Sequence, residues 1–158
     1  MAVAVFGAAA AAAVVGVAAC AAGLRRRIAI VTVEGPSMQP TLADGERVLV
    51  RRAGPAAVRR GQIVLIEKPG DGGWRAGPPR WPGDQREWLI KRVAAVPGDR
   101  RPPVIPGATA GSPVPAGQLA VLGDNPSRSL DSRQFGYVPA DRILGIVCLP
   151  PQKQHTGP

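Results

Sequence analysis

Two residues of this sequence have the chemistry of a nucleophile and its base. Ser37 lies in a Gly-Pro-Ser turn, and Lys91 lies within the apolar run 88–93. The single histidine, His155, lies in a polar stretch near the end of the chain. A serine hydroxyl becomes a good nucleophile only when a neighbouring base removes its proton, and that base is usually imidazole. A serine hydrolase built from this chain would therefore use lysine instead.

Lysine can take up that proton only while it is neutral. Its pKa in water is about 10.4, and burial among apolar groups can lower this value by about 3–5 units. Leu89, Ile90 and Val93 could supply such surroundings. A pKa near 7 would cost the fold about 4–5 kcal/mol, which indicates a function. Each residue alone is a weak signal, because turn serines and lysines that reach water are common.

The elements that must position these two residues are short strands. Gly- and Pro-rich turns separate β-branched runs, and the only convincing helical segment is the N-terminal one. We therefore predict a mainly β domain whose first strand is buried, and loops at 69–86 and 100–117. The strands are expected at 27–33, 46–52, 62–67, 88–96, 118–122 and 143–149.

Residues 1–24 carry no charged side chain and are mostly Ala and Val. This segment is long enough for a membrane span of about 20 residues. The alternatives are a cleaved signal peptide, which would need a basic start that is absent here, and a lipoprotein-type modification at Cys20. We predict an N-terminal transmembrane helix at 1–24, a catalytic domain at 25–149 and a flexible tail at 150–158.

The net charge of +9 comes mostly from scattered arginines. Without interleaved aromatic residues they do not indicate nucleic-acid binding, and a lipid bilayer with an anionic surface is the expected partner. Trp74 and Trp81 would either enter the membrane interface or cover the edge of the core. The two cysteines do not form a disulfide framework. No residue cluster has metal-ligand spacing, so we expect no metal and no cofactor.

Four blocks of the sequence, in order, resemble the type I signal peptidases, the membrane-anchored Ser/Lys proteases of peptidase family S26. They lie at 35–42, 60–64, 90–99 and 123–139. The resemblance implies a signal-peptidase-like β domain. It also implies a serine endopeptidase that removes signal peptides from exported precursor proteins after small-x-small motifs, without a cofactor.

The same resemblance implies roles for individual residues. Ser37 would be the nucleophile and Lys91 the general base, and Ser129 would orient the lysine ammonium group. Two ion pairs would brace the site: Asp131 with Arg133, and Asp124 with Arg92.

The oxyanion and substrate pockets follow from the resemblance too. The backbone N–H of Ser37 would bind the oxyanion, and Gly35 stands where some family members have a serine that assists. Losing one such donor typically costs about 10²–10³ in rate. The pockets for the small substrate residues would be lined by Val33, Met38, Leu42 and Ile90.

Several alternatives stay open. A self-cleaving repressor-type peptidase shares the Ser/Lys core but would carry a DNA-binding motif where this chain has an apolar segment. A maturation protease dedicated to one precursor and a non-catalytic, membrane-tethered module of the same fold are two more. The arginines at 25–27 favour a cytoplasmic domain by the positive-inside tendency. The resemblance implies a single-pass membrane protein with an extracytoplasmic domain, which we expect here.

Overall fold

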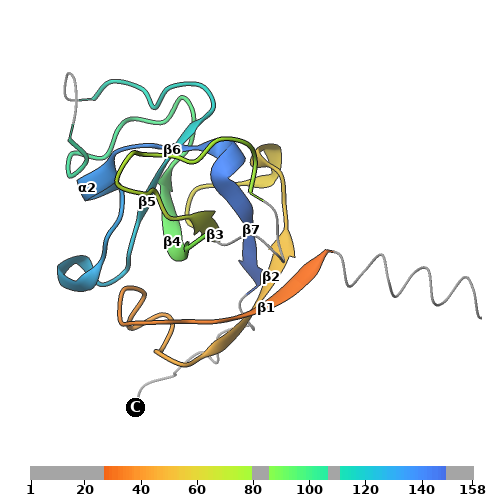
Figure 1. Ribbon diagram of the computed structural model, residues 1–158. Coiled ribbons are helices and arrows are strands. Elements are labelled where there is room, and N and C mark those ends of the chain that lie inside the picture. Colours follow the sequence, from red (N-terminus) through yellow and green to blue (C-terminus); the bar gives the residue numbers. More distant parts are fainter. Residues whose placement is uncertain (1–26, 80–85, 107–110, 149–158) are drawn as a thin grey trace, which may run out of the picture.

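The computed structural model describes residues 27–79, 86–106 and 111–148. These residues form a seven-stranded antiparallel sheet with the strand order β1-β2-β7-β3-β4-β5-β6. Figure 1 shows β1 and β2 on one side of the domain, with β5, β6 and the one-turn helix α2 on the other. The elements are β1 (Ile28–Thr32), β2 (Arg47–Arg52), β3 (Ile63–Glu67), β4 (Trp88–Ala95), β5 (Gln118–Leu122), α2 (Ser132–Phe135), β6 (Val138–Pro139) and β7 (Ile143–Cys148), with short 3-10 turns at Pro55–Ala57, Pro126–Arg128 and Ala140–Arg142.

The mainly β prediction is confirmed. β5 has the predicted bounds, and each of the other predicted strands is recovered within one residue at either end. The sequence reasoning missed β6 and α2, which are too short to show a periodicity.

The prediction that the first strand is buried is wrong. In β1 exposed and half-buried residues alternate, and Ile28 and Ile30 are 40% and 56% exposed. The reason is its position, because β1 ends the strand order and, among the described strands, pairs with β2 alone. A β-branched composition does not distinguish such an edge strand from a central one.

The predicted transmembrane helix at 1–24 and the tail at 150–158 lie outside the described residues, as do Cys20 and Trp81. Within the described ranges, no helix has the length and apolar character needed to cross a bilayer.

The core lies on both faces of β3. Ile63 and Leu65 belong to one apolar cluster, and Val64 and Ile66 belong to another. This division follows from the alternation of side chains along a strand. Trp74 packs edge-on against Phe135, with ring centroids 5.9 Å apart, at the border of the second cluster. Of the two roles considered for Trp74, the structure therefore supports covering the core edge.

Candidate active site

Ser37 is held by the connection between β1 and β2. This segment turns at Gly35, whose φ of +78° is in the left-handed region that favours glycine. The Gly35 N–H donates to Asp44 Oδ1 at 2.8 Å, and the Leu42 N–H donates to the Met38 carbonyl at 2.9 Å. Met38 and Leu42 are almost fully buried in the first apolar cluster. The turn that carries Ser37 is therefore anchored by two core side chains.

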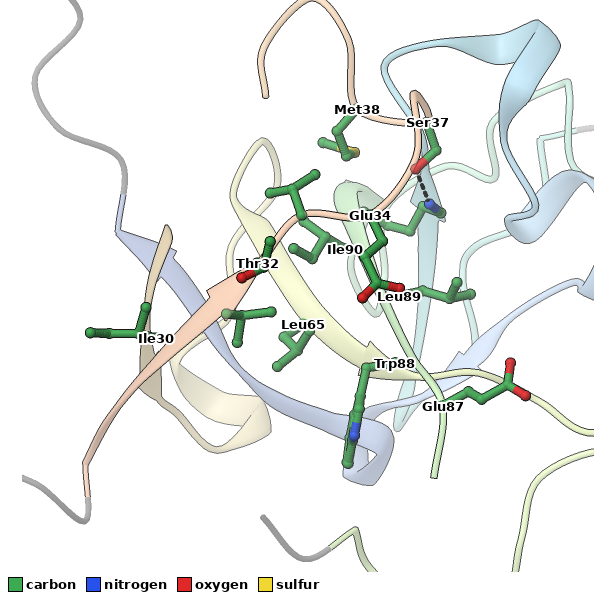
Figure 2. A pocket seen from close by; sticks show the side chains of 13 residues that line it. Ile30, Thr32, Glu34, Ser37, Met38, Leu65, Glu87, Trp88, Leu89 and Ile90 are labelled. Carbon is green, nitrogen blue, oxygen red and sulfur yellow. Dashed lines mark hydrogen bonds between the residues drawn. The ribbon is translucent and has the colours of Figure 1, made fainter. Parts of the chain in front are cut away.

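Lys91 lies opposite that turn, on β4. Its side chain is only 2% exposed, and its Nζ donates to Ser37 Oγ at 2.8 Å (Figure 2). Alternation places Leu89 and Val93 on the same face of β4, and the register places Val64 of β3 beside Lys91. The structure thus brings together the two residues that the sequence analysis paired.

The surroundings of Lys91 lower its pKa to about 8. Burial is the main cause, because it penalises the charged ammonium form. The negative charges of Asp131 and Asp124 raise the pKa and so limit the effect, whereas the positive charge of Arg133 lowers it further. A lysine with this pKa is neutral often enough near neutral pH to act as a base at 2.8 Å from the hydroxyl.

Asp131 is the centre of a buried network next to Ser37 and Lys91. It is fully buried and accepts hydrogen bonds from Ser129 Oγ at 2.7 Å and the Gly123 N–H at 2.8 Å. Arg133 binds it through Nε at 2.9 Å and a terminal nitrogen at 2.6 Å. Burial alone would raise the pKa of Asp131, but these hydrogen bonds, that of Arg133 foremost, hold it below its usual value.

Ser129 forms a hydrogen bond within this network. Its hydroxyl donates to Asp131, and among the described residues it forms no hydrogen bond with Lys91. Asp131 in turn acts on Lys91 through its charge. The structure thus links Ser129 to Lys91 through Asp131, and the orienting role that the resemblance implied for Ser129 stays a prediction.

The second predicted ion pair joins β4 to the segment after β5. Arg92 Nε donates to Asp124 Oδ1 at 2.8 Å, and a terminal nitrogen of Arg92 lies 2.6 Å from Oδ2. The hydrogen bond from Arg92 is the main reason that the pKa of Asp124 is lowered. Thr41 also donates to Asp124 Oδ2, at 2.5 Å. The pair thus connects β4 with the loop that carries Ser37.

The sequence reasoning did not assign roles to Gly123 and Thr41. Gly123 donates to Asp131 and leaves no room for a side chain, while the Ser37 carbonyl accepts a hydrogen bond from the Asn125 N–H at 3.0 Å. Thr41 lies in the block at 35–42 and Gly123 in the block at 123–139. Their position in these blocks was the only sign in the sequence that they belong to the site.

A pocket of about 590 Å³ opens beside Ser37 and Lys91, which belong to its lining (Figure 2). Val33, Met38 and Ile90 line it, whereas Leu42, the fourth residue that the resemblance implied for the substrate pockets, belongs to the first apolar cluster and is not part of the lining. Val31, Leu65, Trp88 and Leu89 complete most of its apolar wall.

Ser37 also belongs to the lining of this pocket, and its N–H donates to no acceptor among the described residues, which suits an oxyanion donor. The Gly35 N–H is already used by Asp44. In the described ranges, no three Cys, His or carboxylate residues gather at a possible metal site.

Comparisons with known proteins agree with this geometry. The family model described as signal peptidase, peptidase S26, matches residues 5–100 and 103–150. Signal peptidase IB of Staphylococcus aureus strain COL is 31% identical over 155 residues, covering 73% of this chain and 73% of that protein. The mitochondrial ATP-independent inner membrane protease subunit 1a of Arabidopsis thaliana is 32% identical over 124 residues, covering 74% of this chain and 66% of the plant protein. Together with the fold, these matches show that the chain belongs to the signal peptidase family, peptidase S26.

Proposed function

We propose that this chain is a serine endopeptidase that removes signal peptides from exported precursor proteins after small-x-small motifs. The observation that carries the proposal is the contact between Lys91 Nζ and Ser37 Oγ, at 2.8 Å, with the pKa of the lysine lowered to about 8. Family membership supports the same reaction. Side chains with strongly shifted pKa values cluster at functional sites, because burying a charge without such a function costs stability.

The reaction would begin when neutral Lys91 takes the proton of Ser37. The freed Oγ attacks the scissile carbonyl, and the Ser37 N–H binds the oxyanion that forms. The Lys91 ammonium then donates its proton to the leaving amine. Lys91, neutral again, takes a proton from water, which attacks the acyl ester; the ester bond then breaks and Lys91 returns the proton to Ser37 Oγ.

The substrate would bind as an extended strand along β1. In the described structure β1 pairs with β2 alone, so its other edge offers free backbone groups beside the pocket. Alternate side chains of such a strand point to the same side, so two small residues would enter the pocket together. Its walls, formed by Val33, Met38 and Ile90, would exclude bulky side chains next to Ser37.

The two ion pairs would hold the nucleophile and base in register. Arg92 and Asp124 connect β4 to the loop of Ser37 through Thr41. Asp131 keeps a negative charge near Lys91 and limits the fall of its pKa. These residues would position the dyad without contacting the substrate.

We also propose that segment 1–24 anchors the chain in the membrane and that the catalytic domain faces the extracytoplasmic side, where signal peptides become accessible. The sequence of the segment supports the anchor. Membrane fractionation and protease protection of the full chain test both parts.

The central experiment is cleavage of precursors with an Ala-x-Ala site by the full chain in detergent. Ser37→Ala and Lys91→Met should abolish cleavage, whereas Ser127→Ala, which removes an exposed hydroxyl outside the pocket, should retain it. Wild-type activity in either dyad variant would overturn the assignment. Cleavage of one precursor among many would identify a dedicated maturation protease. Precursor binding without any cleavage would instead indicate the non-catalytic module.

A further inference from the structure

Glu34 has a position in the pocket that the proposed reaction does not use. It follows β1, lines the pocket and comes shortly before Ser37 in the chain. Its side chain is exposed, and it forms no hydrogen bond or ion pair with any other described residue. Figure 2 shows it among the residues that surround the pocket. The carboxylate is therefore available to a ligand.

The other charges of the pocket are compensated. Glu87 also lines it, but forms an ion pair with Lys68, and the hydrogen bond from Lys68 is the main reason that the pKa of Glu87 is lowered. Lys91 is neutral in the form that acts as a base, and its protonated form is stabilised by the negative charges of Asp131 and Asp124. Glu34 is thus the uncompensated charge of this lining, in a chain whose net charge is +9. A pocket with this charge favours a cationic group on the substrate.

The alternation along β1 indicates which substrate residue Glu34 would meet. Val31 and Val33 point toward the core, whereas Thr32 and Glu34 belong to the exposed series. When two strands lie side by side in a sheet, the side chains that point to the same face of the sheet contact one another across the strands. If the two small residues of a substrate strand share the inner face with Val31 and Val33, the residue between them shares the face of Glu34.

We propose that Glu34 selects substrates with Lys or Arg between the two small residues of the small-x-small motif. This inference deepens the proposed function and rests on it. An opposite-charge pair across neighbouring strands should favour Lys over Gln at this position by about 1.5- to 5-fold, and a like-charge pair should disfavour Glu by a similar factor. Because the pair is exposed to solvent, the preference should shrink as salt is raised.

Three otherwise identical peptides, with Ala-Lys-Ala, Ala-Gln-Ala and Ala-Glu-Ala sites, test the proposal on the full chain in detergent. The expected order of kcat/KM is Lys over Gln over Glu. Glu34→Gln should remove the order, and Glu34→Lys should reverse it. Asp71→Asn, which removes an exposed carboxylate that does not line the pocket, should leave it unchanged.

Binding of the same peptides to Ser37→Ala separates this inference from the proposed function. A lack of cleavage by the wild type would contradict the peptidase, and the order of affinities would still decide the role of Glu34. Equal affinities and equal kcat/KM values for the three peptides would overturn the inference while leaving the peptidase intact. An order that persists in Glu34→Gln would overturn it as well.

Discussion

Gly123 and Ser129 are packed so closely that a Cβ atom at position 123 would lie 2.1 Å from Ser129 Oγ. The same Cβ would lie 2.7 Å from the carbonyl oxygen of Ser37. Gly123, which follows β5, therefore lies against both the turn that carries Ser37 and the network around Asp131. Its missing side chain is what allows these segments to meet.

Gly123→Ala should destabilise the protein and reduce cleavage. The added methyl group must displace the Ser37 backbone as well as the Ser129 side chain, and such overpacking typically costs about 1–3 kcal/mol. Denaturant unfolding and peptide cleavage measure the two effects. Gly54→Ala is the matched control, because Gly54 has a φ of −76° and no atom near its would-be Cβ. Equal stability of the two variants would contradict the close packing.

Cleavage should depend on pH through Lys91. Its pKa of about 8 means that the lysine is mostly protonated at pH 7 and mostly neutral at pH 9. The value of kcat/KM should therefore rise about tenfold per pH unit below pH 8 and level off above it. A pH–rate profile on a neutral peptide measures this. A profile that is flat from pH 6 to pH 9 would contradict lysine as the base.

Lys91→Met should abolish cleavage and make the fold more stable at pH 7. The folded chain holds Lys91 with a pKa of about 8 instead of 10.5, so burial of its charge costs on the order of 3 kcal/mol below pH 8. Between pH 8 and pH 10.5, Lys91 binds more protons in the unfolded chain than in the folded one. The free energy of unfolding of the wild type therefore rises with pH over this range. The advantage of Lys91→Met should accordingly shrink from pH 8 to pH 10.5.

Denaturant unfolding at several pH values measures that advantage. Lys68→Met is the control, because Lys68 is partly exposed in a surface ion pair and its removal should change stability by less than about 1 kcal/mol. If Lys91→Met were less stable than the wild type at every pH, the cost assigned to the buried lysine would be wrong.

Asp131→Asn should destabilise the fold and move the pH–rate profile. Breaking a buried ion pair by changing one partner typically costs about 3–5 kcal/mol, and Asp131 is fully buried against Arg133. Its charge also raises the pKa of Lys91, so its removal should shift the rising limb of the profile to lower pH.

The shift distinguishes an electrostatic role of Asp131 from a purely structural one. A variant that is merely unstable would lose activity at every pH without moving the midpoint. Asp71→Asn, which changes an exposed carboxylate, should alter neither stability nor midpoint.

The stability that Asp131 contributes should also depend on pH. The pKa of Asp131 is lower in the folded chain than in the unfolded chain. The stabilisation is therefore complete at a pH above the unfolded-state pKa, and it is lost as the pH falls through the folded-state pKa. The wild type should therefore lose more stability than Asp131→Asn on acidification below about pH 4. Acid unfolding followed by circular dichroism measures this difference.

Most of the strands could be predicted from the sequence, because a β-branched run between turn residues is a local signal. β5 at Gln118–Leu122 and β3 at Ile63–Glu67 are examples. The exposure of β1 could not be predicted in this way, because it depends on which strand lies beside it. Candidate catalytic residues could also be named from the sequence, because Ser37 and Lys91 lie in ordered blocks and the chain lacks a suitable histidine.

The tertiary structure alone decided how these residues meet. The buried Glu67 forms ion pairs with Arg86 and Arg142, which lie far from it in the chain. No local sequence pattern predicts such a cluster. Likewise, the pKa of Lys91 depends on burial by neighbouring strands and on the charges of Asp124 and Asp131. Local sequence determines the shape of each segment, whereas desolvation and charge depend on every atom nearby. The residue types therefore indicated a serine nucleophile with a lysine base. Packing set the distance between Lys91 Nζ and Ser37 Oγ and the pKa of Lys91 that such a reaction would need.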